Sequence, residues 1–529
     1  MAIVRRIIEM PTPCPILLTQ SGALRGYNSE GTPRLVCMPH YPVEVTEFIL
    51  PVLERGEVES LSEEQLTGGD IPEDYGSEVL AVSERKVRPL TFYCDSVSWD
   101  DTAANADDMM DKSGDGSREK PWRNVNYATK KLYCILSVFC GYVRLCVKGV
   151  VDYRIMTGSS SYYNKLILTS WNDDENQKQE ILLGRIYDDG YNYAVNTPCI
   201  LSGFHIKVTG TGINYGVYHP FLCMDCEVTF ENYQEPVRSY TAFRGDYSSV
   251  FYRCTARLKN IYVAYGFFAD NYNIFYGCLV YASGCHTLYG YYTNTSGNEN
   301  YRAVFYRCTA DAAWPETNSG MDKYGFWGNG IYYGCYAMLS GMTEGYLYGF
   351  YNQQRYETMA NASVYYSCQV EAQVNAHRFY GFFTSHNAAY HCKVSMHGEL
   401  IDMSGDYYGF YTATCFYCDI TASVSITNDD GILYGIHSSR QICYCTADMN
   451  FSVKENRSSA QAECYAFYDC DDVYNCSASV SASASATPDS DGDFSETERA
   501  CGFYDSSGCH DPCHYVTRTE DGTTDYCNS

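Results

Sequence analysis

A short phrase, in which an aromatic pair precedes a cysteine, recurs along the chain and limits the folds open to it. Superposing the copies around Cys254 and Cys278 gives an every-second-residue pattern of apolar or small side chains. That period of two indicates a strand with one buried face. The phrase returns at these positions: Cys308, Cys335, Cys368 and Cys392, and more loosely Cys226, Cys418, Cys445 and Cys476. The chain is therefore an array of repeats.

A second anchor, Tyr-Gly followed by an apolar or aromatic residue, precedes each cysteine phrase. Tyr265-Gly266 and Tyr289-Gly290 are two examples, and they lie 24 residues apart, the closest spacing in the chain. Wider spacings are filled by polar stretches such as NTSGNENYRA. We therefore expect insertions to fall in one or two loops of each repeat.

Two or three short strands per repeat, with no 3.6-residue apolar pattern between them, exclude helical solenoids and βαβ units. The pattern predicts an all-β chain folded as a parallel β-helix, in which each position lies about 4.8 Å above its equivalent in the next coil. Small cysteine side chains would then fill a narrow interior as a ladder, and the anchor glycine would permit a bend where a Cβ does not fit. The ladder comprises Cys254, Cys278, Cys308, Cys335, Cys368 and Cys392.

The remaining sequence divides into four regions. Residues 1–90 carry no repeat and are rich in Pro and Glu, so we expect a small separate module, or an attachment arm with an acidic linker. Residues 91–198 form the N-terminal cap and first strands, including an amphipathic helix that Asn124 caps. Residues 199–487 contain the coils, and residues 488–529 contain the last coil and the C-terminal cap.

The amino-acid composition of the chain limits the classes of molecule that it can bind. The formal net charge of -27 disfavours nucleic acids and anionic membranes, and no run of apolar residues is long enough for membrane insertion. The chain has 27 cysteines, and its first residues lack the apolar core of a signal peptide. We expect free, buried thiols in a protein that folds in a reducing cytoplasm. The alternative is export by another route, with cross-links between ladder cysteines.

The order of the pieces before the coils resembles right-handed parallel β-helix proteins of the pectate-lyase-like superfamily. The matching pieces are the Gly-rich, Pro-aromatic segment Gly114–Trp122, the helix after Asn124, the strand end Val147–Gly149, and the L-x-G-F-x-I strand Leu201–Ile206. The resemblance covers about residues 91–529. It implies a right-handed parallel β-helix with an N-terminal capping helix, but no single activity, because the superfamily includes lyases, hydrolases, phage tailspikes and adhesins.

A column of turn residues, four positions after the anchor glycine or its alanine substitute, offers the one specific catalytic pair. Asp246 and Asp270 would stand on neighbouring rungs roughly 5 Å apart, the separation of the two carboxylates in retaining glycosidases. Asn294, Asn329 and Gln353 continue the column. The column equally fits a turn ladder in which Asp and Asn side chains bond the backbone.

The first residue of each aromatic pair that precedes a ladder cysteine is predicted to face outward. Sugar rings, or the neighbouring subunits of a trimer, stack on such stripes. Alternatively, bulky outer residues shield one another along the sheet. The stripe comprises Phe251, Phe275, Phe305, Tyr332 and Tyr365.

Two clusters near the C-terminus resemble metal sites. Asp489, Asp491 and Asp493 alternate as the carboxylates of a calcium loop do, although the glutamate that closes an EF-hand is missing. The motif CHDPCH is rich in zinc ligands but lacks the spacing of a zinc knuckle, which favours a capping loop. Calcium is therefore the one metal we keep as an interpretation, and we expect no other cofactor.

An acidic rod with variable loops and an unrelated N-terminal piece looks like a phage tailspike or tail fibre. This resemblance implies a structural or receptor-binding virion appendage that is trimeric, attaches to other virion proteins through its N-terminal module, and contacts host surface polysaccharide. Its location would be the virion, or alternatively the extracellular space or the cell surface. Two other interpretations are a polysaccharide depolymerase of the glycoside hydrolase type on the same fold, and a bacterial surface adhesin.

Overall fold

The computed structural model describes residues 17–18, 24–27, 33–36, 44–55, 80–97, 114–137, 139, 141–157, 161–171, 178–183, 192–209, 212–233, 238–246, 248–270, 272–294, 303–318, 322–352, 363–401, 405–455, 459–487, 495–504, 506, 509–510 and 514–519. Within these ranges the chain is a stacked parallel β-solenoid of about ten turns with one α-helix, which confirms the predicted fold class. The chain divides into two compact units, Met1–Phe230 with Ala242–Thr255, and Glu231–Thr241 with Ala256–Ser529. The domain boundaries expected from the sequence stay predictions.

The first unit contains the capping helix. Helix α2 (Val125–Leu136) begins after Asn124, whose side chain accepts a hydrogen bond from the backbone N–H of Tyr127 at 3.0 Å. The first amides of a helix have no partner within it, which is why an asparagine is favoured there. The predicted capped helix is therefore confirmed. No helix in the described part of the chain is long and apolar enough to cross a membrane.

The rest of the first unit consists of short strands. The antiparallel pieces are β1 (Leu17–Leu18), β2 (Leu24–Tyr27), β3 (Pro33–Val36), β4 (Glu44–Val45), β5 (Phe48–Arg55) and β6 (Leu80–Val87). The parallel strands, with the 3-10 turn η1 (Ser161–Lys165), are β7 (Leu90–Ser96), β8 (Val143–Gly149), β9 (Ile155–Met156), β10 (Leu166–Ser170), β11 (Gln179–Leu183), β12 (Tyr193–Asn196), β13 (Ile200–Ser202), β14 (Phe204–Val208), β15 (Tyr215–Tyr218), β16 (Leu222–Met224) and β19 (Val250–Tyr252). Three strands contain the boundaries between the units: β17 (Glu227–Tyr233), β18 (Ser239–Gly245) and β20 (Thr255–Ile261).

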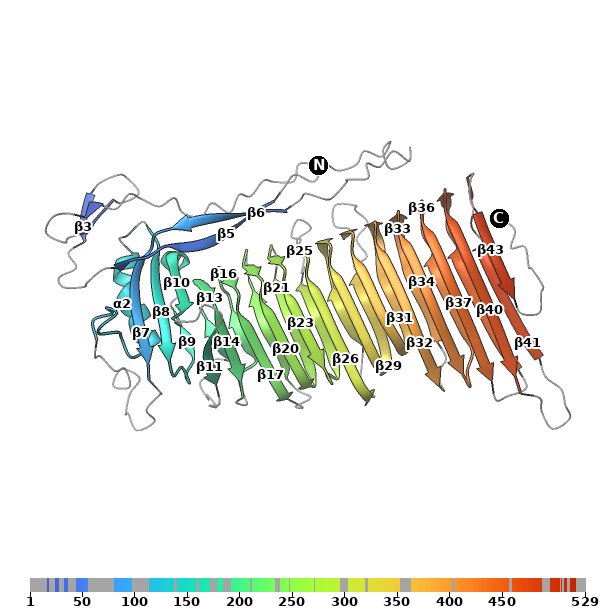
Figure 1. The fold of residues 1–529 in the computed structure, drawn as a ribbon, viewed down its shortest axis with the longest axis horizontal. Helices are drawn as coiled ribbons and strands as arrows, with labels where there is room; N and C mark the ends of the chain where they lie inside the picture. Colours follow the sequence, from blue (N-terminus) through green and yellow to red (C-terminus); the bar gives the residue numbers. More distant parts are fainter. Residues whose placement is uncertain are drawn as a thin grey trace. The chain divides into compact units, whose positions relative to one another are not determined.

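The strands of the second unit stack side by side along the solenoid (Figure 1), and each pairs in parallel with the equivalent strand of the next coil, which gives three parallel sheets. Sheet A contains the strands before each cysteine: β22 (Ile274–Tyr276), β25 (Ala303–Tyr306), β28 (Gly330–Tyr333), β30 (Val364–Tyr366), β36 (Gln441–Cys443), β39 (Asp472–Tyr474), β42 (Cys509–His510) and the ends of β31 (Gln369–Tyr390) and β33 (Gly405–Phe416). Sheet B contains the strands after each cysteine: β23 (Leu279–Ser283), β26 (Thr309–Asn318), β32 (Lys393–Ile401), β34 (Asp419–Thr427), β37 (Thr446–Glu455), β40 (Ser477–Ala486), β43 (His514–Thr519) and the starts of β29 (Tyr336–Asn352) and β31. Sheet C contains the Tyr-Gly anchors: β21 (Val263–Asp270), β24 (Thr287–Asn294), β27 (Lys323–Trp327), β35 (Gly431–His437), β38 (Ser459–Tyr468), β41 (Ser495–Tyr504) and the remaining parts of β29, β31 and β33.

A one-residue corner separates sheet A from sheet B. The residue before the ladder cysteine has a positive φ in coil after coil, for example 51° at Arg307, 55° at Gly334 and 51° at Ser367. This left-handed conformation turns the chain sharply. The phrase around each cysteine is therefore two strands joined by a corner, and not the single strand that a period of two predicts. The corner shifts the inward–outward alternation by one residue.

This shift overturns the predicted outer aromatic stripe. All five of its side chains are at most 1% exposed: Phe251, Phe275, Phe305, Tyr332 and Tyr365. Within the second unit they stack on one another, with ring centroids 4.8 Å apart between Phe275 and Phe305 and again between Phe305 and Tyr332. They form an inner column, so the prediction that they contact a glycan or a neighbouring subunit is wrong.

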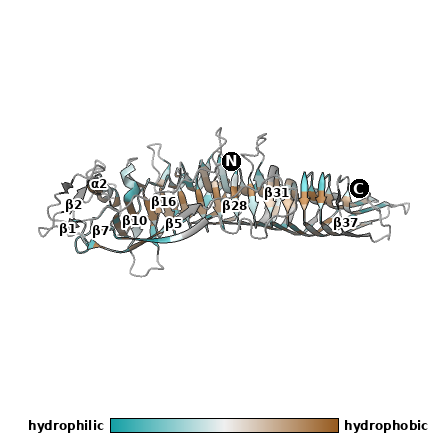
Figure 2. Ribbon diagram, turned by 90° about the horizontal axis from the view of Figure 1, so that it is seen from above, coloured by the Kyte–Doolittle hydropathy of each residue, from teal (hydrophilic) through white to brown (hydrophobic). Residues whose placement is uncertain are grey.

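A second inner column comes from sheet C and packs against the first. Phe350 and Phe382 stack at 4.7 Å, and the edge of Phe350 meets the Tyr365 ring at 5.4 Å and 71°. Apolar segments accordingly recur from strand to strand near β28 and β31 (Figure 2). Burial of each such ring stabilises the fold by about 1.5–3 kcal/mol. The interior of the second unit is thus an apolar core without a lumen for a ligand.

The anchor glycines are required by close approach between coils. A Cβ on Gly349 would lie 2.6 Å from the carbonyl oxygen of Gly381 and 2.6 Å from a methyl group of Val370. Real Cβ atoms do not approach so closely, so an L side chain at this position would push the coils apart. The prediction that a Cβ does not fit here is confirmed at Gly349, which lies within strand β29.

Candidate functional site

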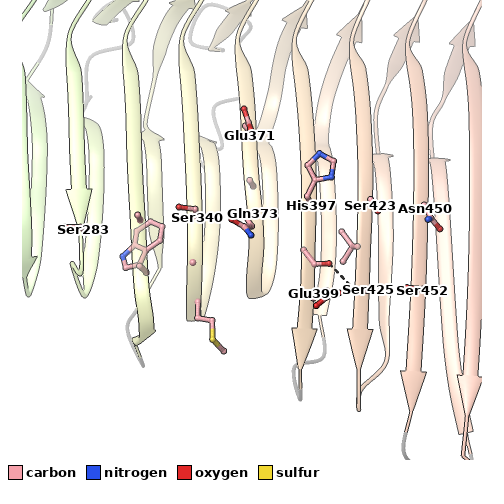
Figure 3. Close-up of a pocket in the computed structure, with 17 residues that line it drawn as sticks. Ser283, Ser340, Glu371, Gln373, His397, Glu399, Ser423, Ser425, Asn450 and Ser452 are labelled. Atoms are coloured by element: carbon pink, nitrogen blue, oxygen red, sulfur yellow. Dashed lines mark hydrogen bonds between the residues drawn. The ribbon is translucent and has the colours of Figure 1, made fainter.

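A groove of about 1000 Å³ lies on the outer face of sheet B in the second unit. Seven neighbouring strands line it, from β23 to β37, so its long direction crosses the strands (Figure 3). Its polar lining comes mostly from β31, β32, β34 and β37. We call this cavity the sheet B groove.

Alternation along the strands places its polar side chains outside. In β34, Thr421 and Ser423 are exposed while Ala422 and Val424 are buried, and β37 repeats the pattern. Since successive side chains of a strand point to opposite faces, small apolar residues hold the sheet to the core while hydroxyl and amide groups face solvent. The sequence of β40, SASVSASASA, continues the same arrangement.

Strand register aligns these side chains into columns across the coils. Gln373 faces His397, His397 faces Ser423, and Ser423 faces Asn450. The column Gln373–His397–Ser423–Asn450 therefore runs along the floor of the groove with one residue per coil, at steps of about 4.8 Å. Each member can donate or accept hydrogen bonds.

Two carboxylates flank this column from opposite sides. Glu371 lies two residues before Gln373 on β31, and Glu399 lies two residues after His397 on β32. Figure 3 shows the Glu371 and Glu399 side chains toward opposite edges of the groove. Of the described residues that line the groove, none is Lys or Arg. The floor column is therefore polar, with one carboxylate on each side of it.

The polar groups of the groove are partly engaged with one another. The Tyr336 hydroxyl donates a hydrogen bond to the Glu371 carboxylate, and Ser395 Oγ lies 3.0 Å from His397 Nε2. Ser425 donates to the backbone carbonyl of Gly398 at 3.5 Å. These contacts hold the side chains in place, and Glu371 and His397 stay exposed on the outer face.

The two carboxylates of the groove do not form a glycosidase pair. Glu371 faces Ser395, and Glu399 lies four residues beyond Ser395 on the same strand. Four residues of strand span roughly 13 Å. Glycosidases place their two carboxylates about 5–5.5 Å apart when retaining and about 6.5–9.5 Å apart when inverting. The arrangement suits binding better than hydrolysis.

Neither predicted catalytic aspartate lines the groove, and the two belong to different units. Asp246, in the first unit, pairs with His219. Asp270, in the second unit, accepts a hydrogen bond from the side-chain amide of Asn294 at 3.2 Å. The Asn294 contact fits a turn ladder along the column. The catalytic role of the two aspartates stays a prediction.

The ladder cysteines have no access to a substrate. All six are buried with 0% exposure: Cys254, Cys278, Cys308, Cys335, Cys368 and Cys392. Nineteen described cysteines are free thiols, these six among them, and Cys501 is in a disulfide. Burial raises the pKa of Cys335 and Cys368 well above the usual thiol range. Because the thiolate is the nucleophile and metal ligand, Cys335 and Cys368 are inert, and the complete burial of all six ladder cysteines gives them a structural role.

The predicted metal ligands fall outside what the structure describes. Asp489, Asp491 and Asp493 lie in the segment 488–494, outside the described residues, and so do the side chains of the CHDPCH motif. Among the described residues, no three His, Cys, Asp or Glu side chains gather as metal ligands. Calcium binding by the three aspartates stays a prediction.

An outer aromatic surface on sheet C is a second feature that the sequence predictions missed. Two columns of rings run along it, one from the anchor tyrosines and one from the residue three positions later, such as Tyr348 with Tyr351. Tyr380 stacks between Tyr348 and Tyr408 at 5.1 and 4.8 Å, with planes within 7°. Each ring face is covered by the next ring, and the anchor tyrosines Tyr348, Tyr380 and Tyr408 are at most 8% exposed, so these columns offer no free face for a sugar.

The sequence did carry a signal for the groove, in the polar residues that alternate after each cysteine. Glu371 and Gln373 follow Cys368, and Ser395, His397 and Glu399 follow Cys392. Their alignment depends on the pairing of strands whose separation in sequence varies from coil to coil. A residue pattern alone does not fix that pairing, which is why the groove was missed.

Comparison with known proteins gives one distant structural likeness. No family model matches the sequence, and no curated protein matches it either. A solved structure, that of PfbA, a surface adhesin of Streptococcus pneumoniae, aligns over 66% of this chain and 82% of its own, with 8% sequence identity and a TM-score of 0.21. A likeness at that level does not carry function from one protein to the other.

Proposed function

We propose that this protein is a non-catalytic binding solenoid that holds a polysaccharide chain in the sheet B groove. The observation that carries the proposal is the floor column Gln373–His397–Ser423–Asn450, which offers one hydrogen-bonding side chain per coil on an open, elongated surface. A polysaccharide is a linear repeat of hydroxyl-bearing rings. A regular column of amide, imidazole and hydroxyl groups is complementary to such a ligand.

The separation of Glu371 and Glu399 supports binding over cleavage, since the two strand positions lie too far apart for a catalytic pair. The rigid core below the groove supports the same conclusion. Binding to a preformed surface costs less conformational entropy than binding to a mobile one.

The wider role that we propose is a virion appendage of the tailspike or tail-fibre type, in which the groove contacts a host surface polysaccharide. Residues 1–90 would attach the protein to other virion proteins, and the protein would be a homotrimer. Detection of the chain in purified particles by mass spectrometry tests the location, and light scattering of the purified protein tests the trimer. Its detection in bacterial cell-surface fractions, with none in particles, would favour an adhesin instead.

A retention experiment tests the groove. The full-length protein is passed over immobilised neutral, amine-bearing and uronate-bearing polysaccharides, and the supernatant is analysed for released oligosaccharides. We expect retention on at least one of them without release of fragments. Ser423→Ile, which places a larger side chain on the groove floor, should abolish retention. Ser479→Ile makes the same change at an exposed position of β40 outside the groove, and should retain the glycan as the wild type does.

Two results would contradict the proposal. Equal retention by Ser423→Ile and the wild type would exclude the groove as the binding site. Released oligosaccharides would make the protein a depolymerase, and Asp246→Asn and Asp270→Asn would then test the predicted catalytic pair.

A further inference from the structure

The charge of the sheet B groove restricts the glycans that it can hold, an inference that rests on the proposed function. The groove lining contains Glu371 and Glu399, and of the described residues that line it none carries a permanent positive charge. Both glutamates are exposed, and neither forms an ion pair with a Lys or Arg among the described residues. Their charge is therefore available to a ligand.

A polysaccharide bound along the floor column would pass between the two carboxylates. The column passes through Gln373 on β31 and His397 on β32, which are neighbours in the sheet. Glu371 lies on one side of this column and Glu399 on the other, on these same two strands. A chain bound along the column would thus meet one carboxylate on each side within two successive coils.

From this arrangement we infer that the sheet B groove selects polysaccharides bearing free amino groups. A protonated amine on the sugar ring would pair with Glu371 or Glu399, while the floor column binds the ring hydroxyls. A uronate or sulfated chain would bring its negative charges beside two carboxylates, with no Lys or Arg among the described lining residues to compensate them. Repulsion between the negative charges of such a ligand and these two carboxylates opposes binding.

The net charge of the whole chain also favours cationic glycans over anionic ones. The formal net charge of -27 repels polyanions and attracts polycations before contact. Long-range attraction alone would not depend on particular residues, so a test must separate it from pairing inside the groove.

Three soluble probes separate these effects: chitosan oligosaccharides, their N-acetylated counterparts, and oligogalacturonate. Affinities for the full-length protein are measured by calorimetry at low salt and about pH 6, where glutamates are ionised. We expect chitosan oligosaccharides to bind most tightly and oligogalacturonate most weakly. The preference for chitosan over its N-acetylated form should fall as salt is added, because salt screens exposed charges.

Variants of the groove glutamates test whether the preference for chitosan arises in the groove. Glu371→Gln and Glu399→Gln remove the charge but keep the shape, and each should reduce the chitosan preference by about two- to five-fold, the range of an exposed ion pair. Glu231→Gln removes an exposed carboxylate elsewhere in the second unit, and it should leave the preference unchanged. Ser425→Lys, which adds a cation to the lining, should improve binding of oligogalacturonate.

The possible failures are distinct. Oligogalacturonate binding as tightly as chitosan would overturn the inference, and so would an unchanged preference in the double variant Glu371→Gln/Glu399→Gln. Absence of binding to all three probes, together with no retention on the immobilised polysaccharides, would overturn the proposed function itself.

Discussion

The Sγ atom of Cys335 lies 3.5 Å from the carbonyl oxygen of Phe305, one coil earlier, and 3.6 Å from that of Tyr333 in its own coil. Cys308, Cys368, Cys392 and Cys418 repeat this double contact. The thiol is thus a small side chain that fills the corner and offers a weak hydrogen bond to two carbonyl groups. This explains why the residue after the corner is a cysteine in so many coils.

A larger side chain at this corner should destabilise the solenoid. Cys335→Leu adds volume where the thiol is fully buried, and we expect a loss of about 1–3 kcal/mol in the free energy of unfolding. The midpoint of urea unfolding, followed by circular dichroism, measures it. Ser477→Leu introduces the same residue at an exposed position and should stay within about 0.5 kcal/mol of the wild type. Equal midpoints for the two variants would contradict the packing role.

The ladder thiols should resist alkylation in the folded protein. Burial raises the pKa of Cys335 and Cys368, so these thiols stay protonated and hidden at a pH where an exposed cysteine reacts. Treatment with a maleimide, followed by peptide mass spectrometry, should leave both unmodified without denaturant and modify both in urea. Rapid labelling of either cysteine in the native protein would show that the ladder is open to solvent.

Lys323 should reduce stability below about pH 8. Its side chain occupies an inward position between Leu288 and Leu347, is 0% exposed, and donates a hydrogen bond to the carbonyl oxygen of His286. Burial lowers the pKa of Lys323 to about 8. The unfolded chain binds this proton more tightly than the folded one, so stability rises as pH increases from about 8 toward the ordinary lysine range.

Lys323→Met tests this directly. We expect it to stabilise the protein at pH 7 by about 3 kcal/mol and to flatten the rise in stability above pH 8. Lys393→Met, at an exposed lysine that pairs with Asp419, should change stability by less than about 1 kcal/mol. Urea midpoints at several pH values give the comparison. A destabilised Lys323→Met protein would mean that the buried amine has a structural role beyond its single hydrogen bond.

The outer aromatic columns of sheet C should contribute to stability and not to glycan binding. Tyr380→Leu removes a ring that stacks on both sides, so we expect a lower unfolding midpoint. Because the ring faces are already covered, glycan retention should be unchanged. A loss of retention with an unchanged midpoint would place the binding surface on sheet C.

The sequence predicted the repeat architecture well because its strongest signals are local. The cysteine and the Tyr-Gly anchor, or a close variant of it, recur from coil to coil and serve a similar packing role. The inward or outward direction of residues near the corner was harder to predict. A single positive φ at residues such as Arg307 reverses the inward–outward alternation of the side chains. Arginine and serine are not residue types from which a positive φ is predicted.

The groove and the buried lysine could not be predicted from the residue pattern for a different reason. Both depend on which strands are neighbours, and loops of different length separate those strands. Lys323 precedes an anchor tyrosine at a position that is apolar in the neighbouring coils, where Leu288 and Leu347 stand. Its charge would suggest an outward side chain, and its pairing with these two leucines places it inward. Side chains on one column come together through register, which the sequence does not state.

Hydrogen exchange with and without a bound glycan tests the central claim most directly. The full-length protein is labelled in the presence of the polysaccharide that retains it, and peptides are analysed by mass spectrometry. Our account predicts slower exchange in peptides that contain Gln373, His397 and Ser423, with no change in peptides of sheet C. Protection on sheet C, or around Asp246 and Asp270, with none in the groove would contradict it.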